Sequence, residues 1–186
     1  MKVLVLDAFD PESPQAILAD AAVEALQSQG HQVTRRVLVG GPFEVFMSAD
    51  ERREYHGDQP LMSPETVEDA AALKAADGLL FCYPTTMHTI PAVLKSWLER
   101  VLVPGVAFVF DERERVRPGM TNIRRLGAVT ATNHGRLASL KARNSGKRTL
   151  LWNIRLSCHR LARRTWVAVP ADAPDPEAVR KALSRW

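Results

Sequence analysis

The sequence predicts an α/β fold, a doubly wound five-stranded parallel sheet with helices on both faces. Short aliphatic runs alternate along the chain with segments whose apolar residues recur at helical spacing, which is the pattern of strands joined by crossover helices. The runs are continuous, as expected for strands that are buried on both faces. The 186 residues, 46% hydrophobic and 25% charged, have the size and composition of one globular domain, which we place at residues 1–186.

The first half of the chain is expected to hold three strands and two helices. The expected elements, in order, are a strand at 3–6, a helix at 14–30, a strand at 33–39, a helix at 64–75 and a strand at 78–83. Both helices follow a Ser-Pro pair, because serine is a favoured N-cap and proline suits the first helical position. Gly30 marks the end of the first helix. Residues 42–63 are polar and are expected to be irregular.

The second half is expected to hold two strands and three helices. The expected elements, in order, are a helix at 91–102, a strand at 126–130, a helix at 149–163, a strand at 166–169 and a helix at 176–186. Residues 149–163 alternate apolar positions with arginines and a histidine, which indicates an amphipathic helix. Five strands in this arrangement suit the flavodoxin-like order 2-1-3-4-5.

Composition excludes several classes of protein. No apolar run approaches the roughly 20 residues of a membrane helix. The opening apolar stretch, residues 3–6, is closed by Asp7 and is too short for a secretory signal, so we expect a cytoplasmic protein. The two cysteines, Cys82 and Cys158, lie far apart in apolar surroundings, which argues against a disulfide framework and against a metal site.

The net charge of +4 hides a segregation of charge. Residues 1–114 carry 9 Lys/Arg and 18 Asp/Glu, whereas residues 115–171 carry 13 Lys/Arg and no acid. One interpretation is that this basic block lies beside the acidic half and neutralises it. The other is that it holds an anion, such as a phosphorylated cofactor, nucleic acid or an acidic partner. No aromatic-interleaved basic motif is present, so no nucleic-acid partner is expected.

Ligands in such sheets bind at the carboxyl ends of the strands, near the switch point between the first and third strands. The loop after the first strand lacks the glycine patterns of dinucleotide and P-loop sites. A hydroxyl and free N–H groups at a helix start can still hold a phosphate, and Ser13 and Gln15 are the candidate donors. The alternative is that Ser13 only caps the helix.

The loop after the third strand carries a denser pattern. A strand ending at Pro84 is followed by an extended loop, a second proline at Pro91, a Lys-x-Trp pair, a basic residue with Val-Leu, and the Gly-x-Ala-Phe of residues 105–108. This stretch of about 28 residues resembles the NAD(P)H quinone reductase family of flavodoxin-like flavoproteins. The resemblance implies that the backbone of the loop lies along a flavin ring, with the contacts made by Pro84, Thr85, Thr86, Met87 and His88.

The loop after the fourth strand departs from the family pattern. The family has Thr-Thr-Gly-Gly there, and this chain has Thr130-Ala131-Thr132-Asn133-His134-Gly135. The resemblance assigns Thr130, Thr132 and Asn133 to cofactor binding, and His134 is the candidate catalytic residue. A second departure lies in the first loop, where Phe9 stands in the region of the family's histidine.

The resemblance implies an FMN-dependent NAD(P)H:quinone oxidoreductase, with hydride transfer to the flavin and two-electron reduction of a quinone, in a homodimer. The basic stretch around Arg136, Lys141 and Arg143 favours NADPH as the electron donor. FAD is the second choice, because the sequence lacks the long C-terminal extension of FAD-using relatives. No Ser-His-Asp set or zinc spacing is present, which favours a cofactor enzyme over a hydrolase. The alternative is a regulatory or ancillary binding protein, for example on a potassium-efflux system, with weak or no flavin.

Overall fold

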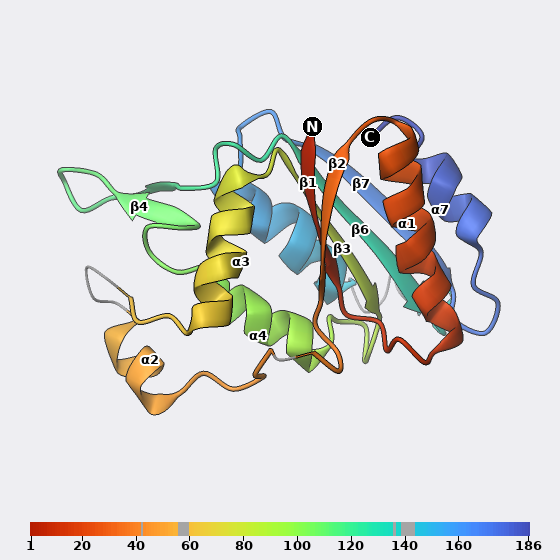
Figure 1. Cartoon of the computed structure of the whole chain (residues 1–186), viewed down its shortest axis with the longest axis horizontal. Coiled ribbons are helices and arrows are strands. Elements are labelled where there is room, and N and C mark those ends of the chain that lie inside the picture. The colour runs from red at the N-terminus through yellow and green to blue at the C-terminus, as the bar shows by residue number, and fades with distance from the viewer. Residues whose placement is uncertain (42, 56–59, 136, 139–143) are drawn as a thin grey trace.

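The fold is described by a computed structural model covering residues 1–41, 43–55, 60–135, 137–138 and 144–186. Its centre is a parallel sheet of five strands in the order β2-β1-β3-β6-β7, which confirms the predicted order 2-1-3-4-5 (Figure 1). The strands are β1 (Lys2–Asp7), β2 (Gln32–Val37), β3 (Gly78–Pro84), β6 (Arg125–Thr132) and β7 (Arg163–Pro170). All five expected strands are therefore present, most of them longer than their aliphatic runs.

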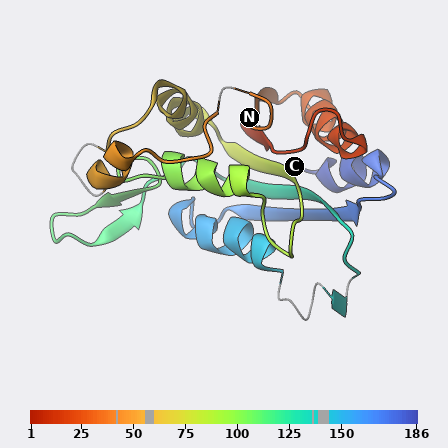
Figure 2. The same cartoon turned by 90° about the horizontal axis from the view of Figure 1, so that it is seen from below.

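Helices cover both faces of the sheet. On one face lie α1 (Ile17–Ser28), which follows a 3₁₀ turn at Pro14–Ala16, and α7 (Pro176–Leu183). On the other lie α3 (Pro64–Ala75), α4 (Ala92–Val101) and a helical segment, residues 145–157, which runs through α6 (Ser145–Arg148), a π-helical stretch and a 3₁₀ turn. Figure 2 shows this segment on the opposite side of the sheet from α1 and α7. No helix in the described ranges is long and apolar enough to cross a membrane.

Alternate residues of the buried strands fill two separate cores. In β1, Val3 and Val5 pack toward α1 and α7, whereas Leu4 and Leu6 pack toward α3 and α4. All four are at most 1% exposed, which explains why the strand reads as a continuous aliphatic run. In the core under α1 and α7, Trp186 packs its ring over Gly127 of β6, where a Cβ would collide with it.

Three segments differ from the sequence prediction. Residues 42–63 are not wholly irregular, because they contain α2 (Ala49–Glu54), which begins with a capping box between Ser48 and Glu51. A two-stranded hairpin of β4 (Phe108–Phe110) and β5 (Val116–Pro118) projects from the body and was not predicted (Figure 1).

The helix expected at 149–163 lies instead at residues 145–157, and β7 already begins at Arg163. Its end is set by Cys158, whose backbone is extended, and by Arg155, which donates to the carbonyls of Ala162 (3.0 Å) and Arg160 (2.9 Å). Pairing of β7 with β6, in which Arg163 lies opposite Arg125, outweighs the helical periodicity of the sequence.

Candidate functional site

A cavity of about 1480 Å³ opens at the carboxyl ends of β3, β6 and β7, on the face that carries the helical segment 145–157. The two loops singled out by the sequence form one wall, β7 forms the floor, and the helical segment forms the opposite wall. Its lining includes Thr85, His88, Thr130, Thr132, Asn133, His134, Asn144, Lys147, Arg148, Trp152, Asn153 and Trp166. Six of these residues are among the eleven that the sequence predicted.

Side-chain contacts connect the loop after β3 with the end of β6 and the loop that follows it. The hydroxyls of Thr85 and Thr130 are 2.7 Å apart and share a hydrogen bond. The His134 backbone N–H donates to the Thr132 hydroxyl (3.2 Å), and the His134 ring stacks on the His88 ring with centroids 3.8 Å apart. These contacts bring the predicted residues of both loops to one place. Asn133, between them, keeps an ordinary negative φ.

The loop after β3 is a tight turn. The Thr86 N–H donates to the Thr89 carbonyl (3.1 Å), and the Thr89 N–H donates back to the Thr86 carbonyl (2.9 Å). Between them Met87 (φ 48°) and His88 (φ 62°) are both left-handed, as in a type I′ turn. The Thr86 N–H is thus used within the turn, and the flavin contact that the resemblance implies for Thr86 stays a prediction.

Two further residues of this loop lie outside the lining of the cavity. Pro84 ends β3 inside the sheet ladder, paired with Ala131. Met87 stands at the tip of the turn with 85% of its surface exposed. Their roles toward a cofactor remain predictions.

The loop after β1 does not present the donors that the sequence suggested. The Ser13 hydroxyl donates to the Asp10 carbonyl (2.7 Å) and makes no cap bond to the helix, so the expected side-chain cap is wrong, whereas a role of Ser13 toward a phosphate stays a prediction. The Gln15 amide donates to the Ala171 carbonyl (2.6 Å). Neither residue lines the cavity, because a local turn and the β7–α7 connection take up their side chains.

A buried acid fixes the start of this loop. Asp7, at the end of β1, is 2% exposed, pairs with Arg35 (2.6 Å) and accepts the Phe9 N–H (3.0 Å). Burial raises the pKa of the Asp7 carboxyl despite the opposing effect of Arg35. Phe9 is thereby turned inward, 1% exposed, into the core beneath α1. Where the family has a histidine, this chain therefore has a core residue.

The opposite wall of the cavity was not predicted from the sequence. Lys147 and Arg148 supply its positive charge, and the Lys147 ammonium lies 5.4 Å from the centre of the Trp166 ring. In the sequence, the acid-free basic block was the one sign of this positive charge. Only the packing of residues 145–157 beside β7 shows which Lys and Arg residues of the block line the cavity. Arg136, Lys141 and Arg143, suggested for NADPH, lie outside the described residues.

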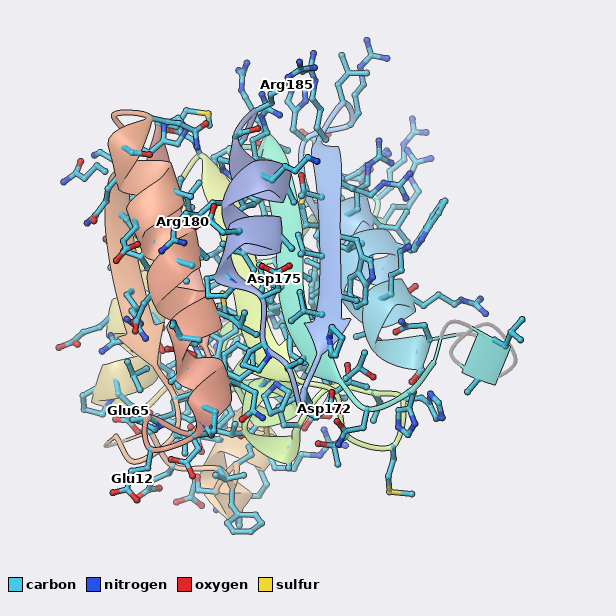
Figure 3. All side chains as sticks on the ribbon, turned by 90° about the vertical axis from the view of Figure 1, so that its right-hand side faces the viewer. Glu12, Glu65, Asp172, Asp175, Arg180 and Arg185 are labelled. Carbon is cyan, nitrogen blue, oxygen red and sulfur yellow. The ribbon has the colours of Figure 1, made fainter. Side chains whose placement is uncertain are left out.

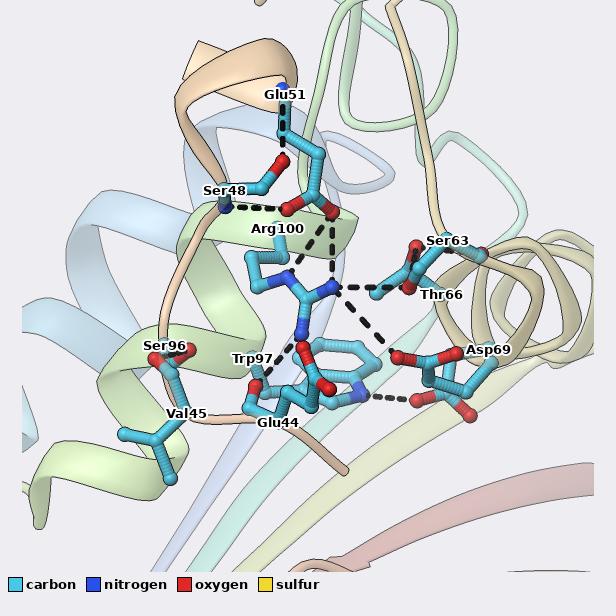
Figure 4. Close-up of polar contacts among 11 residues, drawn as sticks. Glu44, Val45, Ser48, Glu51, Ser63, Thr66, Asp69, Ser96, Trp97 and Arg100 are labelled. Carbon is cyan, nitrogen blue, oxygen red and sulfur yellow. Dashed lines mark hydrogen bonds and ion pairs between the residues drawn. The ribbon is translucent and has the colours of Figure 1, made fainter. Parts of the chain in front are cut away.

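The residues that carried the family resemblance in α4 serve the structure. Trp97 is fully buried and donates its indole N–H to Asp69 (2.7 Å; Figure 4). Asp69 also pairs with Arg36. Burial raises the pKa of the Asp69 carboxyl, although Trp97 and Arg36 oppose the shift. These contacts hold α3 against α4 and lie away from the cavity lining.

Arg100 joins the segment before α3 to α4. It is 3% exposed and donates to Glu51 (2.8 Å), to the Ser63 hydroxyl (2.9 Å) and to the Glu44 carbonyl (2.6 Å) (Figure 4). Its guanidinium also lies 5.3 Å from the centre of the Phe43 ring. The basic residue of the motif therefore holds Glu44, Glu51 and Ser63 against α4.

Comparison with known proteins places this fold in a class. Residues 1–182 match the family described as having a flavodoxin-like fold, and the chain belongs to that family. The match confirms the resemblance drawn from the sequence.

Particular relatives are quinone reductases. The chain is 29% identical over 167 residues to NAD(P)H dehydrogenase (quinone) 1 of Rattus norvegicus, covering 82% of this chain and 61% of the rat protein. It is 37% identical over 119 residues to an FMN-dependent NADH:quinone oxidoreductase of Gluconacetobacter diazotrophicus, covering 59% of each. The chain thus spans about three fifths of these relatives.

Solved structures show the same fold. The NAD(P)H:quinone oxidoreductase of Methanothermobacter marburgensis superposes with a TM-score of 0.78 at 21% identity, over 100% of this chain and 94% of that one. At that identity the match shows the fold alone, and the activity has to be argued from the residues of the cavity.

Proposed function

We propose that the chain is a flavin-dependent NAD(P)H:quinone oxidoreductase that binds FMN in the cavity at the carboxyl ends of β3, β6 and β7. The observation that carries the proposal is that six residues predicted from the sequence for flavin binding or catalysis line one cavity. Relatives of the chain are named for this activity and, in one case, for FMN.

The residues present fit a flavin. The cavity exceeds the roughly 300–1,000 Å³ of common ligand sites, so it has room for a flavin and for a second flat ring. Trp152 and Trp166 offer apolar faces to such rings. Thr85, Asn133 and Asn153 offer polar groups to a ring edge, and Lys147 and Arg148 offer positive charge to a phosphate.

A bound flavin would supply the redox chemistry, taking hydride from a reduced nicotinamide and delivering two electrons to a quinone. The residues of the chain would bind the flavin and orient the nicotinamide and the quinone against it. The Thr85–Thr130 hydrogen bond fixes the spacing of the two loops, and the stacked His88 and His134 rings close one side of the cavity. We propose His134 as the group nearest to a substrate oxygen, where an imidazole can donate a proton.

The experiment is a reconstitution. The purified chain is incubated with FMN or FAD and desalted, and its visible spectrum is recorded. Oxidation of NADH and of NADPH is then followed with a quinone and with an azo dye as acceptors. We expect a yellow protein that retains FMN more tightly than FAD and turns over with a quinone. A reconstituted protein with no NAD(P)H oxidation on any acceptor would overturn the assignment. Size-exclusion chromatography tests the homodimer that the resemblance implies.

A second candidate function has specific support. The side-chain donors of Ser13 and Gln15 are occupied within the chain, and Phe9 is buried where the family has a polar contact. An ancillary binding protein with weak or no flavin is consistent with this first loop.

Ser13→Ala tests whether the first loop takes part in FMN binding. A hydrogen bond to a charged phosphate is worth about 1.5–3 kcal/mol, so its loss weakens FMN binding about tenfold to a hundredfold if Ser13 turns toward the ligand. Unchanged affinity with slightly lower thermal stability shows that Ser13 serves only its turn. A chain that cannot be loaded with flavin at all supports the ancillary function.

A further inference from the structure

One end of the molecule carries an unneutralised basic surface. We define it by Arg124, Arg160, Arg163, Arg164 and Arg185, which are all exposed. The strand register brings them together: Arg163 donates its backbone N–H to the Arg124 carbonyl (3.0 Å), and Arg125, beside them, donates to the Arg185 carbonyl (3.3 Å). In Figure 3, Arg185 lies among nitrogen-tipped side chains at the top, whereas Glu12 and Glu65 lie at the lower end.

The chain does not neutralise this surface. Within the described ranges, none of its five arginines forms an ion pair with a carboxylate; the paired arginines of the acid-free block are Arg115 and Arg117, both on Asp111 of the hairpin. Asp77 lies at the same edge, and its carboxylate accepts the Lys2 backbone N–H (2.8 Å). The expectation that the basic block is balanced by the acidic half is therefore wrong for this surface.

Apolar side chains are interleaved with the arginines. Leu156 and Leu161 are 76% and 65% exposed. Trp152 is 55% exposed, and the Arg164 guanidinium lies 3.9 Å from the centre of its ring. The loop that carries Leu161 is held in place by Arg155, through its bonds to the carbonyls of Ala162 and Arg160. Exposed leucines and a tryptophan among unpaired arginines suit a partner that is both anionic and apolar.

We propose that this surface docks on an anionic phospholipid bilayer. The arginines lie at the level of the phosphates, Trp152 occupies the interface, and Leu156 and Leu161 enter the acyl boundary. A bilayer is favoured over nucleic acid because a phosphate backbone offers the two leucines no apolar contact. Docking does not depend on a flavin. If the proposed function holds, Trp152 links the two sites, because it also lines the cavity, and docking brings the cavity to the phase in which lipophilic quinones dissolve.

The test is co-sedimentation of the full chain with vesicles of phosphatidylcholine alone or mixed with phosphatidylglycerol. We expect binding only to the anionic vesicles, and loss of binding at high salt, because the screening length falls from about 10 Å at 0.1 M to about 3 Å at 1 M. The Arg160→Gln/Arg163→Gln double variant removes two charges without breaking a side-chain hydrogen bond described in the structure, and should bind about 25-fold more weakly, about fivefold per arginine.

The matched control is Arg52→Gln/Arg113→Gln, which removes two exposed charges from α2 and from the hairpin turn and should bind as the parent does. The Leu156→Ser/Leu161→Ser variant should also lose binding, which distinguishes a bilayer from a purely electrostatic partner. Equal weakening by both arginine pairs, undiminished binding of the leucine variant, or tighter binding to duplex DNA than to vesicles would overturn the proposal.

Discussion

Removal of the Arg100 guanidinium is the perturbation for which the structure gives the largest expected effect. Arg100→Met keeps most of the apolar stem but leaves Glu51, which is 7% exposed, without its cation. Breaking a buried ion pair from one side costs about 3–5 kcal/mol, because the remaining charge stays buried and unpaired. Against a typical total stability of about 5–15 kcal/mol, this is a large fraction. The variant should therefore unfold well before the parent.

The assay is urea unfolding followed by tryptophan fluorescence, to which the buried Trp97 contributes. With an m-value of about 2 kcal/mol/M, the midpoint should fall by about 2 M. The Arg100→Met/Glu51→Gln double variant should recover much of this loss, since it removes the unpaired charge. A single variant within about 1 kcal/mol of the parent, or a double variant as unstable as the sum of both single changes, refutes the reasoning.

The same pair has a pH signature. Burial pushes the pKa of Glu51 upward, but the Ser48 N–H bond and Arg100 outweigh it and leave the pKa below its ordinary value of 4.5. A carboxyl with a lowered folded-state pKa contributes stability that is present above pH 4.5 and is lost as the pH falls through the folded-state value. In the acid range, the stability of Arg100→Met should therefore fall less steeply with decreasing pH than that of the parent.

Three further predictions test other parts of the structure. The Met87→Asn/His88→Gly variant gives the left-handed turn the residues that suit it, so thermal unfolding should occur at a higher temperature, and quinone turnover should change if the loop contacts the acceptor. Gly127→Ala drives a Cβ into the Trp186 ring and should cost about 1–3 kcal/mol in urea unfolding, with partial rescue when Trp186 is changed to leucine. Burial raises the pKa of the Cys158 thiol to about 12 and that of Cys82 well above its ordinary value, so the native chain should show no fast thiol reaction with a disulfide reagent at pH 8, and both thiols should react in urea.

Much of the fold could be predicted because its strands are buried on both faces. Val3 to Leu6 and Leu79 to Tyr83 are continuous apolar runs, and such runs between helical segments leave few topologies open. The short helix α2 escaped prediction because its stability comes from the Ser48 capping box and from Arg100, a partner 49 residues away from Glu51. The hairpin of β4 and β5 has three-residue strands, too short for a periodic signal.

The site was predictable to the extent that topology determines it. Thr85 and His134 follow the neighbouring strands β3 and β6, and Thr130 lies near the end of β6. The carboxyl ends of neighbouring parallel strands lie together. Lys147 and Trp152 could not be placed, because their position depends on how residues 145–157 pack beside β7. Ser13 was misplaced because its hydroxyl is satisfied by a turn with Asp10, and a sequence motif does not show such a local competitor.

The central claim is that the cavity at the carboxyl ends of β3, β6 and β7 holds a flavin. Ala168 is exposed on β7 and lines this cavity, so Ala168→Trp should place an indole in the space proposed for the flavin without disturbing the core. Val37→Trp, on the opposite edge strand β2, is the matched control. The deciding measurement is a titration of FMN fluorescence with the parent chain and both variants. We predict saturable quenching with the parent and with Val37→Trp, and none with Ala168→Trp. Equal FMN binding by all three proteins would contradict the placement of the flavin, and no binding by the parent would contradict the claim itself.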